Sequence, residues 1–309
     1  MAAKKFQKKP NFLMFCFLVG LLIFVGFFLI SYPKNIFFKK EDFLKSLPTP
    51  APYPKNSTGK PAPILSAKSV VVMDVDSGSI LLERNFRLIT PPASTTKIMS
   101  ALIVLENYNL DQVIEVKDLG EIEGQTMKLL PKELIKVENL LCGLLVASAN
   151  DAAIVLAKNF PNGEAGFVWA MNQKAKELKL ENTNFTNPVG FDDPNHFSTA
   201  FDLARLGAFA MRNPEFAKIV GTEKITVSDV NNEIFHHLLN INSLVGKLPG
   251  VKGVKTGWTQ AAGECLVTFV EKNGRKVIFV ILGSTDRFRE TEKLINWVFE
   301  NFQWENFNQ

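Results

Sequence analysis

The 309-residue chain has few of the residues that build metal centres and disulfide frameworks. It contains only three cysteines and three histidines. Three cysteines are too few for a disulfide framework, and Cys142 and Cys265 lie in apolar runs, so we expect buried free thiols there. His196, His236 and His237 have no cysteine or histidine partner at the spacing of a zinc site. The sequence therefore predicts neither a metal nor a cofactor.

An excess of charge is also missing from most of the chain. Four of the 35 basic residues are lysines in the first ten positions, and the 31 that are left equal the 31 acidic residues in number. A neutral domain has no basic patch to attract a polyanion, so the composition gives no reason to expect nucleic-acid binding.

One long hydrophobic run is present, near the N-terminus. Residues 11–31 are almost uninterrupted apolar residues without a charge, enough to cross a bilayer core of about 30 Å as a helix. A cleaved signal peptide is the alternative, but its apolar region would be only about 7–15 residues and would end at a small-residue cleavage site. The preceding lysines predict a cytoplasmic N-terminus by the positive-inside rule. We therefore expect a cytoplasmic tail (1–10), a single-pass transmembrane signal-anchor (11–32) in the cell membrane and an extracytoplasmic remainder.

Proline is concentrated in the segment that follows. Residues 33–66 are charged and then proline-rich, with six prolines between positions 48 and 63. This spacing favours an extended polyproline segment. We expect a linker that holds a folded domain, residues 67–309, away from the membrane.

Two β-hairpins are predicted near the ends of that domain. The first pairs residues 69–74 with 79–83, and the second pairs 265–270 with 276–282 across Asn273-Gly274, a strong two-residue turn signal. Antiparallel strands from both ends of the domain are therefore expected.

The sequence between the hairpins shows apolar stripes at helical spacing. A capped helix start is expected at residues 198–202 and a last helix at 290–302. The stripes are formed by Leu134, Val137, Leu141 and Leu144, by Phe167, Met171, Ala175 and Leu178, and by Leu294, Ile295, Val298 and Phe299. The pattern predicts an α+β domain in which helices flank an antiparallel sheet and an all-helical subdomain is inserted.

Ser94 and Lys97 stand at the start of another predicted helix. Pro91 and Pro92 stop the preceding structure, and residues 97–106 follow with apolar side chains at helical spacing. A step of three residues puts Ser94 and Lys97 on one helix face, with their Cβ atoms about 5–6 Å apart. An amine is thereby placed within reach of a hydroxyl.

Two further motifs, Ser148-Ala149-Asn150 and Lys255-Thr256-Gly257, follow in the chain. In order and separation, the Ser-x-x-Lys, Ser-x-Asn and Lys-Thr-Gly motifs match those of penicillin-binding proteins and class A β-lactamases. Over roughly residues 67–302 the chain resembles the D-alanyl-D-alanine carboxypeptidases, which are low-molecular-mass penicillin-binding proteins of the serine peptidase type. Residues 91–94, 187–191, 196–200 and 262–267 also resemble this family.

The residue types suggest how such a site would react. A serine hydroxyl needs an adjacent base to act as a nucleophile. A lysine can be that base only if its ammonium form is destabilised, and burial and a second cation both act in that direction. Lys97 on an apolar helix, with Lys255 across a cleft, would meet both conditions. We therefore assign Ser94 as the nucleophile and Lys97 as the base.

The resemblance implies further roles for the other motif residues. It implies that Ser148 relays a proton towards the leaving amine and that Asn150 holds Lys97 and the substrate amide. Lys255 and Thr256 would bind the terminal carboxylate of the substrate through charge-assisted contacts.

Two backbone roles follow from the same resemblance. Gly257 would let the strand approach the substrate. The N–H groups of Ser94 and Trp258 would form an oxyanion hole. Trp258 stands where the family more often has histidine or tyrosine, which leaves its side-chain contacts open.

Three more polar residues are candidates for the site. His196 is expected to be a structural hydrogen-bonding residue, because a lysine already fills the role of the base. Arg287 and Arg289 follow the last predicted strand, and either could assist carboxylate binding or be a solvated pair. Neither is assigned to the site.

The resemblance implies a β-lactamase/transpeptidase-like fold and an enzyme that removes the terminal D-alanine of peptidoglycan stem peptides through an acyl-enzyme on Ser94. β-Lactam antibiotics would then be covalent inhibitors. An endopeptidase that cuts D-alanine cross-links fits the same residues. A class A β-lactamase would need a deacylating glutamate, but no Glu-x-x-Leu-Asn lies between Asn150 and Lys255. A non-catalytic muropeptide-binding membrane protein is disfavoured because every reactive group is retained.

Better-known members of the family continue into a β-rich domain and a C-terminal membrane-binding helix. This chain ends a few residues after its last predicted helix. We therefore expect the N-terminal segment to provide the membrane anchor.

Overall fold

The computed structural model describes residues 51–306 of the chain. The predicted cytoplasmic tail, the transmembrane signal-anchor and the first part of the predicted linker lie outside the described residues. Between residues 51 and 306, none of the helices combines the length and the hydropathy that crossing a bilayer requires.

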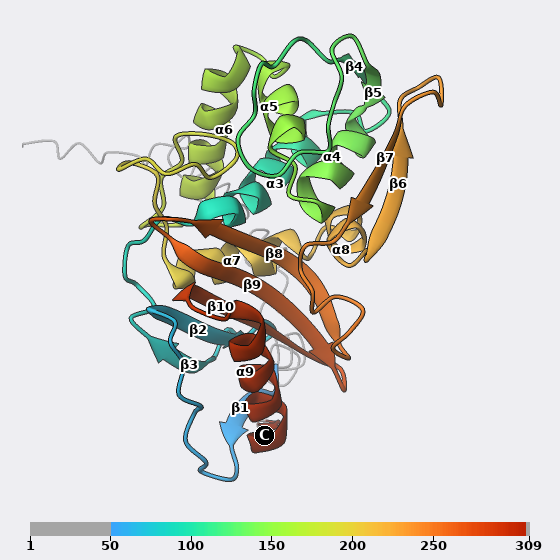
Figure 1. Cartoon of the computed structure of the whole chain (residues 1–309). Coiled ribbons are helices and arrows are strands. Elements are labelled where there is room, and N and C mark those ends of the chain that lie inside the picture. Colours follow the sequence, from blue (N-terminus) through green and yellow to red (C-terminus); the bar gives the residue numbers. More distant parts are fainter. Residues whose placement is uncertain (1–50, 307–309) are drawn as a thin grey trace, which may run out of the picture. The chain divides into compact units, whose positions relative to one another are not determined.

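A five-stranded antiparallel sheet, in the order β3-β2-β10-β9-β8, carries the fold (Figure 1). Both predicted hairpins are confirmed, since β2 pairs with β3 and β9 pairs with β10. β10 also pairs with β2, so strands from the two ends of the domain are neighbours in the sheet. The strands are β2 (Ser69–Asp74), β3 (Ile80–Arg84), β8 (Val251–Thr259), β9 (Gly263–Lys272) and β10 (Arg275–Ser284).

Helices cover both faces of this sheet (Figure 1). The predicted last helix, α9 (Arg287–Asn301), packs its buried Leu294 and Val298 on one face together with Val70 and Val72 of β2. α7 (Ala200–Ala210) packs on the other face, where Val71 is buried. Because successive side chains of a strand point to opposite faces, a strand covered on both sides has a continuous apolar run, as β2 has from Val70 to Met73.

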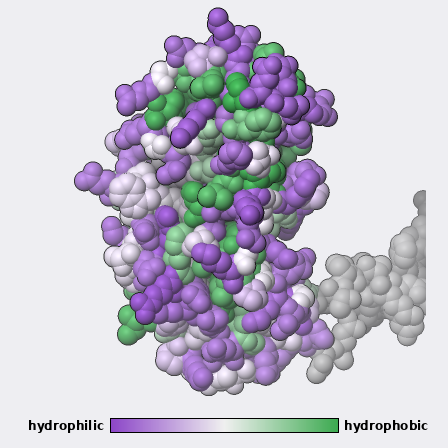
Figure 2. Space-filling model, turned by 45° about the vertical axis from the view of Figure 1, so that its right-hand side comes forward, coloured by the Kyte–Doolittle hydropathy of each residue, from purple (hydrophilic) through white to green (hydrophobic). Residues whose placement is uncertain are grey.

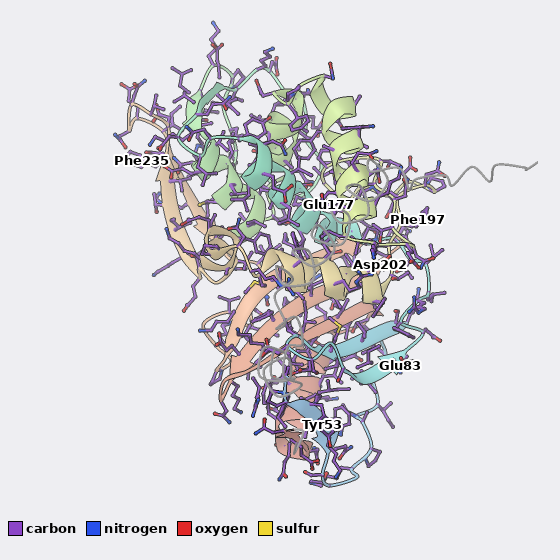
Figure 3. All side chains as sticks on the ribbon, turned by 180° about the vertical axis from the view of Figure 1, so that it is seen from behind. Tyr53, Glu83, Glu177, Phe197, Asp202 and Phe235 are labelled. Atoms are coloured by element: carbon purple, nitrogen blue, oxygen red, sulfur yellow. The ribbon has the colours of Figure 1, made fainter. Side chains whose placement is uncertain are left out.

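The start of α7 confirms the predicted cap. Thr199 has an extended backbone, and its side chain accepts a hydrogen bond of 3.1 Å from the backbone N–H of Asp202. The carboxylate of Asp202 accepts hydrogen bonds from the backbone N–H of Asn182 and the hydroxyl of Thr183. Figure 3 shows Asp202 close to Phe197, in the segment that leads into this helix.

The inserted part of the chain contains the predicted helical stripes. Its helices are α3 (Lys97–Asn107), α4 (Val137–Val146), α5 (Asn150–Lys158), α6 (Gly163–Glu177) and α8 (Pro214–Val220). The inserted part is not all-helical as predicted, because strand pairing adds two small hairpins. They are formed by β4 (Val113–Glu115) with β5 (Leu134–Lys136) and by β6 (Lys224–Ser228) with β7 (Phe235–Leu239). These elements gather at one end of the sheet (Figure 1).

One predicted helical residue is in a strand. Leu134 matches the helical stripe in spacing, but it belongs to β5 and pairs with Glu115 of β4. The backbone is still extended at Lys136, so the helix begins only at Val137. The prediction for Leu134 was wrong because the strand pairing decides its conformation.

The folded part begins earlier than residue 67. β1 (Tyr53–Asn56) pairs antiparallel with β11 (Phe302–Glu305), and the hydroxyl of Tyr53 donates a hydrogen bond of 3.0 Å to the carboxylate of Glu305. The compact unit accordingly starts at Ala51. Composition suggested a free polyproline linker here, but pairing with the C-terminal strand orders the segment. Figure 3 shows Tyr53 at one end of this unit and Phe235, in β7, at the other.

The surface of the unit is mixed in polarity. Hydrophilic residues cover most of the face drawn in Figure 2, and hydrophobic residues are visible between them, mainly in its upper and middle parts. Exposed apolar side chains are common on protein surfaces and do not by themselves indicate a partner.

Candidate active site

Ser94 lies in a single turn of 3₁₀-helix, η1 (Ala93–Thr96), which runs directly into α3. The backbone of Ala93 has φ +50°, a left-handed conformation that is uncommon outside glycine. Both the backbone N–H and the hydroxyl of Thr95 donate to the carbonyl of Pro92, at 3.2 and 2.6 Å. This turn fixes the direction in which the hydroxyl of Ser94 points, and the predicted helix N-terminus is confirmed.

Lys97 is the first residue of α3, and its side chain is fully buried. Its Nζ lies 3.0 Å from Oγ of Ser94, 2.7 Å from Oδ1 of Asn150 and 2.9 Å from the carbonyl oxygen of Val189. Burial lowers the pKa of Lys97 to about 7, and the carboxylate of Asp151 partly offsets this effect. The predicted proximity of the amine to the hydroxyl is confirmed, with burial as the main cause of the lowered pKa.

Ser148 lies in the turn between α4 and α5, and Asn150, which contacts Lys97, begins α5. Ser148 is buried and has a left-handed backbone, with φ +59°. Asn150 opens α5, and its backbone N–H and its Nδ2 donate to the carbonyls of Gln125 and Glu123, both at 2.7 Å. Since strained backbone is often retained at functional sites, the conformation of Ser148 is consistent with a functional turn.

The Lys-Thr-Gly motif lies on β8, the edge strand that packs against η1. A Cβ atom on Gly257 would lie only 3.0 Å from the backbone nitrogen of Ser94 and 3.1 Å from the carbonyl oxygen of Pro92. Glycine is therefore needed for the strand to approach the turn that carries Ser94.

Lys255 is almost completely buried, and its Nζ donates to the carbonyl of Thr256 at 3.1 Å. The pKa of Lys255 lies well below its ordinary value because of burial and then of the charges of Lys97 and Arg287. Repulsion between the two lysines was expected from the sequence as a cause of the lowered pKa of Lys97, and here it acts on Lys255.

Ser94 and residues of the other two motifs line a groove of about 710 Å³. Two aromatic side chains of the lining are exposed at its rim: Phe191, at 38%, and Trp258, at 63%. The groove is lined by Ser94, Glu123, Gly124, Gln125, Ser148, Asn150, Val189, Gly190, Phe191, Asp192, Ile241, Thr256, Gly257, Trp258, Thr259, Gln260 and Arg287.

Arg287 is a groove residue that could not be selected from the sequence. It opens α9, and its Nη1 donates to the carbonyl of Gly257 at 2.7 Å. Arg289, two residues later, lies in a different hollow beside Asp286 and Phe288. The two arginines could not be distinguished from the sequence. In the fold, Arg287 lines the groove and Arg289 does not.

The groove holds polar groups that lack partners. Nε of Arg287 and Oγ1 of Thr256 are buried and have no hydrogen-bond partner among residues 51–306. In the same part of the chain, Lys97, Lys255 and Arg287 form no ion pair with an acidic side chain. Buried donors are normally satisfied, so this end of the groove is suited to an anionic ligand.

His196 is buried beside the turn that carries Ser94, where it makes structural hydrogen bonds. Its Nε2 lies 2.8 Å from Oγ1 of Thr96, and its Nδ1 accepts a hydrogen bond of 3.0 Å from the backbone N–H of Thr186. Burial lowers the pKa of His196 to about 4, against the opposing charges of Asp193 and Asp192. Its predicted structural character is confirmed.

Both cysteines of the described part are buried free thiols, as expected. Burial raises the pKa of Cys142 and of Cys265 to about 11, which keeps both thiols protonated and unreactive near neutral pH. Between residues 51 and 306, no three His, Cys, Asp or Glu side chains come together in a way that could hold a metal ion.

A serine and an asparagine that line one groove beside an antiparallel sheet, with two buried lysines next to them, define a class of serine-dependent acyl-transfer proteins. The sequence profile of one such family, described as D-alanyl-D-alanine carboxypeptidase, matches residues 56–286. The chain therefore belongs to the D-alanyl-D-alanine carboxypeptidase family.

Three proteins illustrate the similarity. D-alanyl-D-alanine carboxypeptidase DacF of Bacillus subtilis is 33% identical over 246 residues, which cover 77% of this chain and 63% of that protein. A D-alanyl-D-alanine endopeptidase of Pseudomonas aeruginosa is 34% identical over 241 residues, covering 76% of this chain and 77% of that protein. The crystal structure of a Streptomyces DD-transpeptidase has a TM-score of 0.74 and 29% identity, covering 78% of this chain and 100% of that one.

The transpeptidase-like α+β fold with its antiparallel sheet is thus confirmed. The chain spans 63–65% of the length of several carboxypeptidase relatives, DacF included.

Proposed function

We propose that this protein is a serine-type D-Ala-D-Ala carboxypeptidase, which removes the terminal D-alanine of peptidoglycan stem peptides through an acyl-enzyme on Ser94. One observation carries the proposal: the buried amine of Lys97, with a pKa of about 7, lies 3.0 Å from Oγ of Ser94. Membership of the carboxypeptidase family supports the substrate class.

The contacts of Lys97 fit a neutral amine acting as the base. A neutral amine has two N–H groups and one lone pair. Oδ1 of Asn150 and the carbonyl of Val189 can only accept, so they take the two N–H groups. The lone pair is then directed to the hydroxyl of Ser94, which donates to it and is activated for attack.

The reaction would proceed as follows. Oγ of Ser94 bonds to the carbonyl carbon of the penultimate D-alanine while its proton passes to Nζ of Lys97. The backbone N–H groups of Ser94 and Trp258 stabilise the resulting oxyanion. The proton then passes by way of the Ser148 hydroxyl to the leaving nitrogen, the C–N bond breaks, and D-alanine departs. Water hydrolyses the ester on Ser94 and regenerates the free hydroxyl.

The cationic end of the groove would select a substrate with a free C-terminal carboxylate. Thr256 and Arg287 line this end and have buried polar atoms without partners within residues 51–306, and the buried amine of Lys255 would be the third donor. Charge-assisted hydrogen bonds from such groups are about twice as strong as neutral ones. These donors match the free carboxylate that follows the bond cut by a carboxypeptidase.

We further propose that the domain is extracytoplasmic and is held at the cell membrane by residues 11–32. The proposal rests on the length of the uncharged apolar run and on the four lysines that precede it. Protease protection in intact spheroplasts tests it: the domain should be degraded from outside, and full protection would contradict the proposed orientation.

The proposed activity is tested on the full chain in detergent, with Ser94→Ala as the control. Incubation with a penicillin should add the mass of one drug molecule to a peptide containing Ser94, and a pentapeptide ending in D-Ala-D-Ala should release D-alanine. Rapid turnover of penicillin without D-alanine release would instead indicate a β-lactamase. The absence of both reactions would overturn the enzymatic proposal.

A further inference from the structure

Asp151 is a buried carboxylate for which the proposed reaction has no role. It lies in the first turn of α5, directly after Asn150, and is 3% exposed. Within residues 51–306 it forms no ion pair. A buried charge of this kind is unfavourable unless hydrogen bonds compensate for the lost hydration, so its hydrogen bonds indicate what it does.

The carboxylate of Asp151 binds the backbone of a distant segment. One oxygen accepts hydrogen bonds from the backbone N–H groups of Met127, at 3.0 Å, and of Ala152, at 2.9 Å. The other oxygen accepts from the backbone N–H of Leu129, at 3.1 Å. Asp151 therefore joins the start of α5 to residues 127–129.

That segment continues into one wall of the groove. Glu123, Gly124 and Gln125 line the groove, and Asn150 donates to the carbonyls of the first and the last of these three. Gly124 has φ +85°, and a Cβ there would lie 2.8 Å from Nδ2 of Asn150. Residues 123–125 are thus packed closely against Asn150, and Asp151 binds the residues that follow them.

We propose that Asp151 is a positioning residue: its carboxylate fixes residues 125–129 on the start of α5 and thereby holds Asn150 against Lys97. The inference rests on the proposed function, because it concerns the geometry of the base in that reaction. If Asp151 had only a structural role, the same hydrogen bonds would simply stabilise the start of α5. The test therefore has to measure a property of Lys97 itself.

The charge of Asp151 supplies such a readout. The carboxylate favours the ammonium form of Lys97 and opposes the effect of burial on its pKa. Asp151→Asn removes this charge and replaces one accepting oxygen with a donor that faces a backbone N–H. The base should become less well positioned and, at the same time, easier to deprotonate.

The experiment compares the wild-type full chain with Asp151→Asn and Asp229→Asn. Asp229 is a matched control, because its buried carboxylate also accepts backbone N–H groups, from Asn231, Glu233 and Ile234, but in the turn between β6 and β7. The rate of Ser94 acylation by a fluorescent penicillin is measured from pH 5 to 9. Hydrogen exchange of residues 125–129 is measured in parallel, and circular dichroism checks the fold.

For Asp151→Asn we expect acylation at pH 8 to be slower by about 10- to 100-fold, the loss that a small misplacement of a reacting group produces. We also expect the acid limb of the pH profile, where the rate falls as Lys97 becomes protonated, to move to lower pH. The amides of Met127 and Leu129 should exchange faster. Asp229→Asn should match the wild type in all three. Unchanged rates, or a loss that is equal at every pH with an unmoved acid limb, would overturn the inference.

If Asp151→Asn does not fold, Asp151→Glu provides the test, since it keeps the charge and displaces the carboxylate. Slower acylation with an acid limb like that of the wild type is then expected, and a wild-type rate overturns the inference. Failure of the wild type itself to acylate would overturn the proposed function instead, so the two failures are distinguishable.

Discussion

Lys97 and Asn150, which are 53 residues apart in the sequence, are joined by a hydrogen bond of 2.7 Å from Nζ to Oδ1. The carbonyl of Val189 accepts a second hydrogen bond from the same amine. These two acceptors come from different parts of the chain and leave the amine directed at Ser94. The tertiary fold thus sets the geometry between the hydroxyl and its base.

Replacement of Lys97 by alanine tests the base directly. Without an acceptor for its proton, the hydroxyl of Ser94 is a weak nucleophile, and acylation by penicillin should slow by about 10² to 10⁴-fold. Stopped-flow measurement with a fluorescent penicillin gives the rate. Acylation within a few-fold of the wild type would show that another group takes the proton.

Lys174→Ala is the matched control for this substitution. Lys174 is also a largely buried helical lysine, but its amine forms ion pairs with Glu106, at 2.8 Å, and Glu177, at 2.9 Å. It lies in α6 and does not line the groove. We expect some loss of stability from this variant and an acylation rate close to that of the wild type.

The pH dependence of acylation should report the titration of Lys97. Its pKa is lowered from 10.5 to about 7, and only the neutral amine can accept the proton of Ser94. The rate should therefore be low at pH 5, rise tenfold per pH unit below pH 7, and level off above it. A rate that rises only above pH 9 would mean that the amine has an ordinary pKa.

Much of the site could be predicted because its key contact is local. Ser94 and Lys97 are one helical turn apart, so their proximity follows from the spacing alone. Likewise, the turn at Asn273-Gly274 and the strands beside it are decided by neighbouring residues. The Ser-x-Asn and Lys-Thr-Gly motifs could be placed only through the family resemblance, since nothing local brings them together.

The parts that could not be predicted depend on distant backbone. The carbonyl of Val189 carries no side-chain signal, and Arg287 differs from Arg289 only in where the turn after β10 directs it. The strand at Tyr53 needs a partner near the other end of the chain. No periodicity in the sequence reports such pairings.

His196→Ala should separate stability from chemistry. The substitution leaves a cavity and two unpaired polar groups, on Thr96 and Thr186, and we expect it to lower the free energy of unfolding by about 2–4 kcal/mol. Below its unfolding transition the variant should still be acylated on Ser94. Loss of acylation in the folded variant would indicate that His196 acts as the base for Ser94, as in a serine-histidine mechanism.

Arg287→Ala tests the selection of a free carboxylate, with Arg289→Ala as the control. Removing a charged donor from the groove should lower kcat/KM for D-alanine release from a pentapeptide by about 10- to 100-fold, since hydrogen bonds to charged groups contribute about 1.5–3 kcal/mol. Arg289 lies outside the groove, so its replacement should have little effect.

A second substrate shows whether the carboxylate is the group that Arg287 contacts. If the C-terminus of the pentapeptide is amidated, the wild type loses the charge-assisted contact and should approach the rate of Arg287→Ala. The effects of amidation and substitution should then be less than additive, because both remove the same interaction. Full additivity in the four rates would mean that other donors bind the carboxylate, and Lys255 and Thr256 would be tested first. Arg287 would then have only its contact with the carbonyl of Gly257.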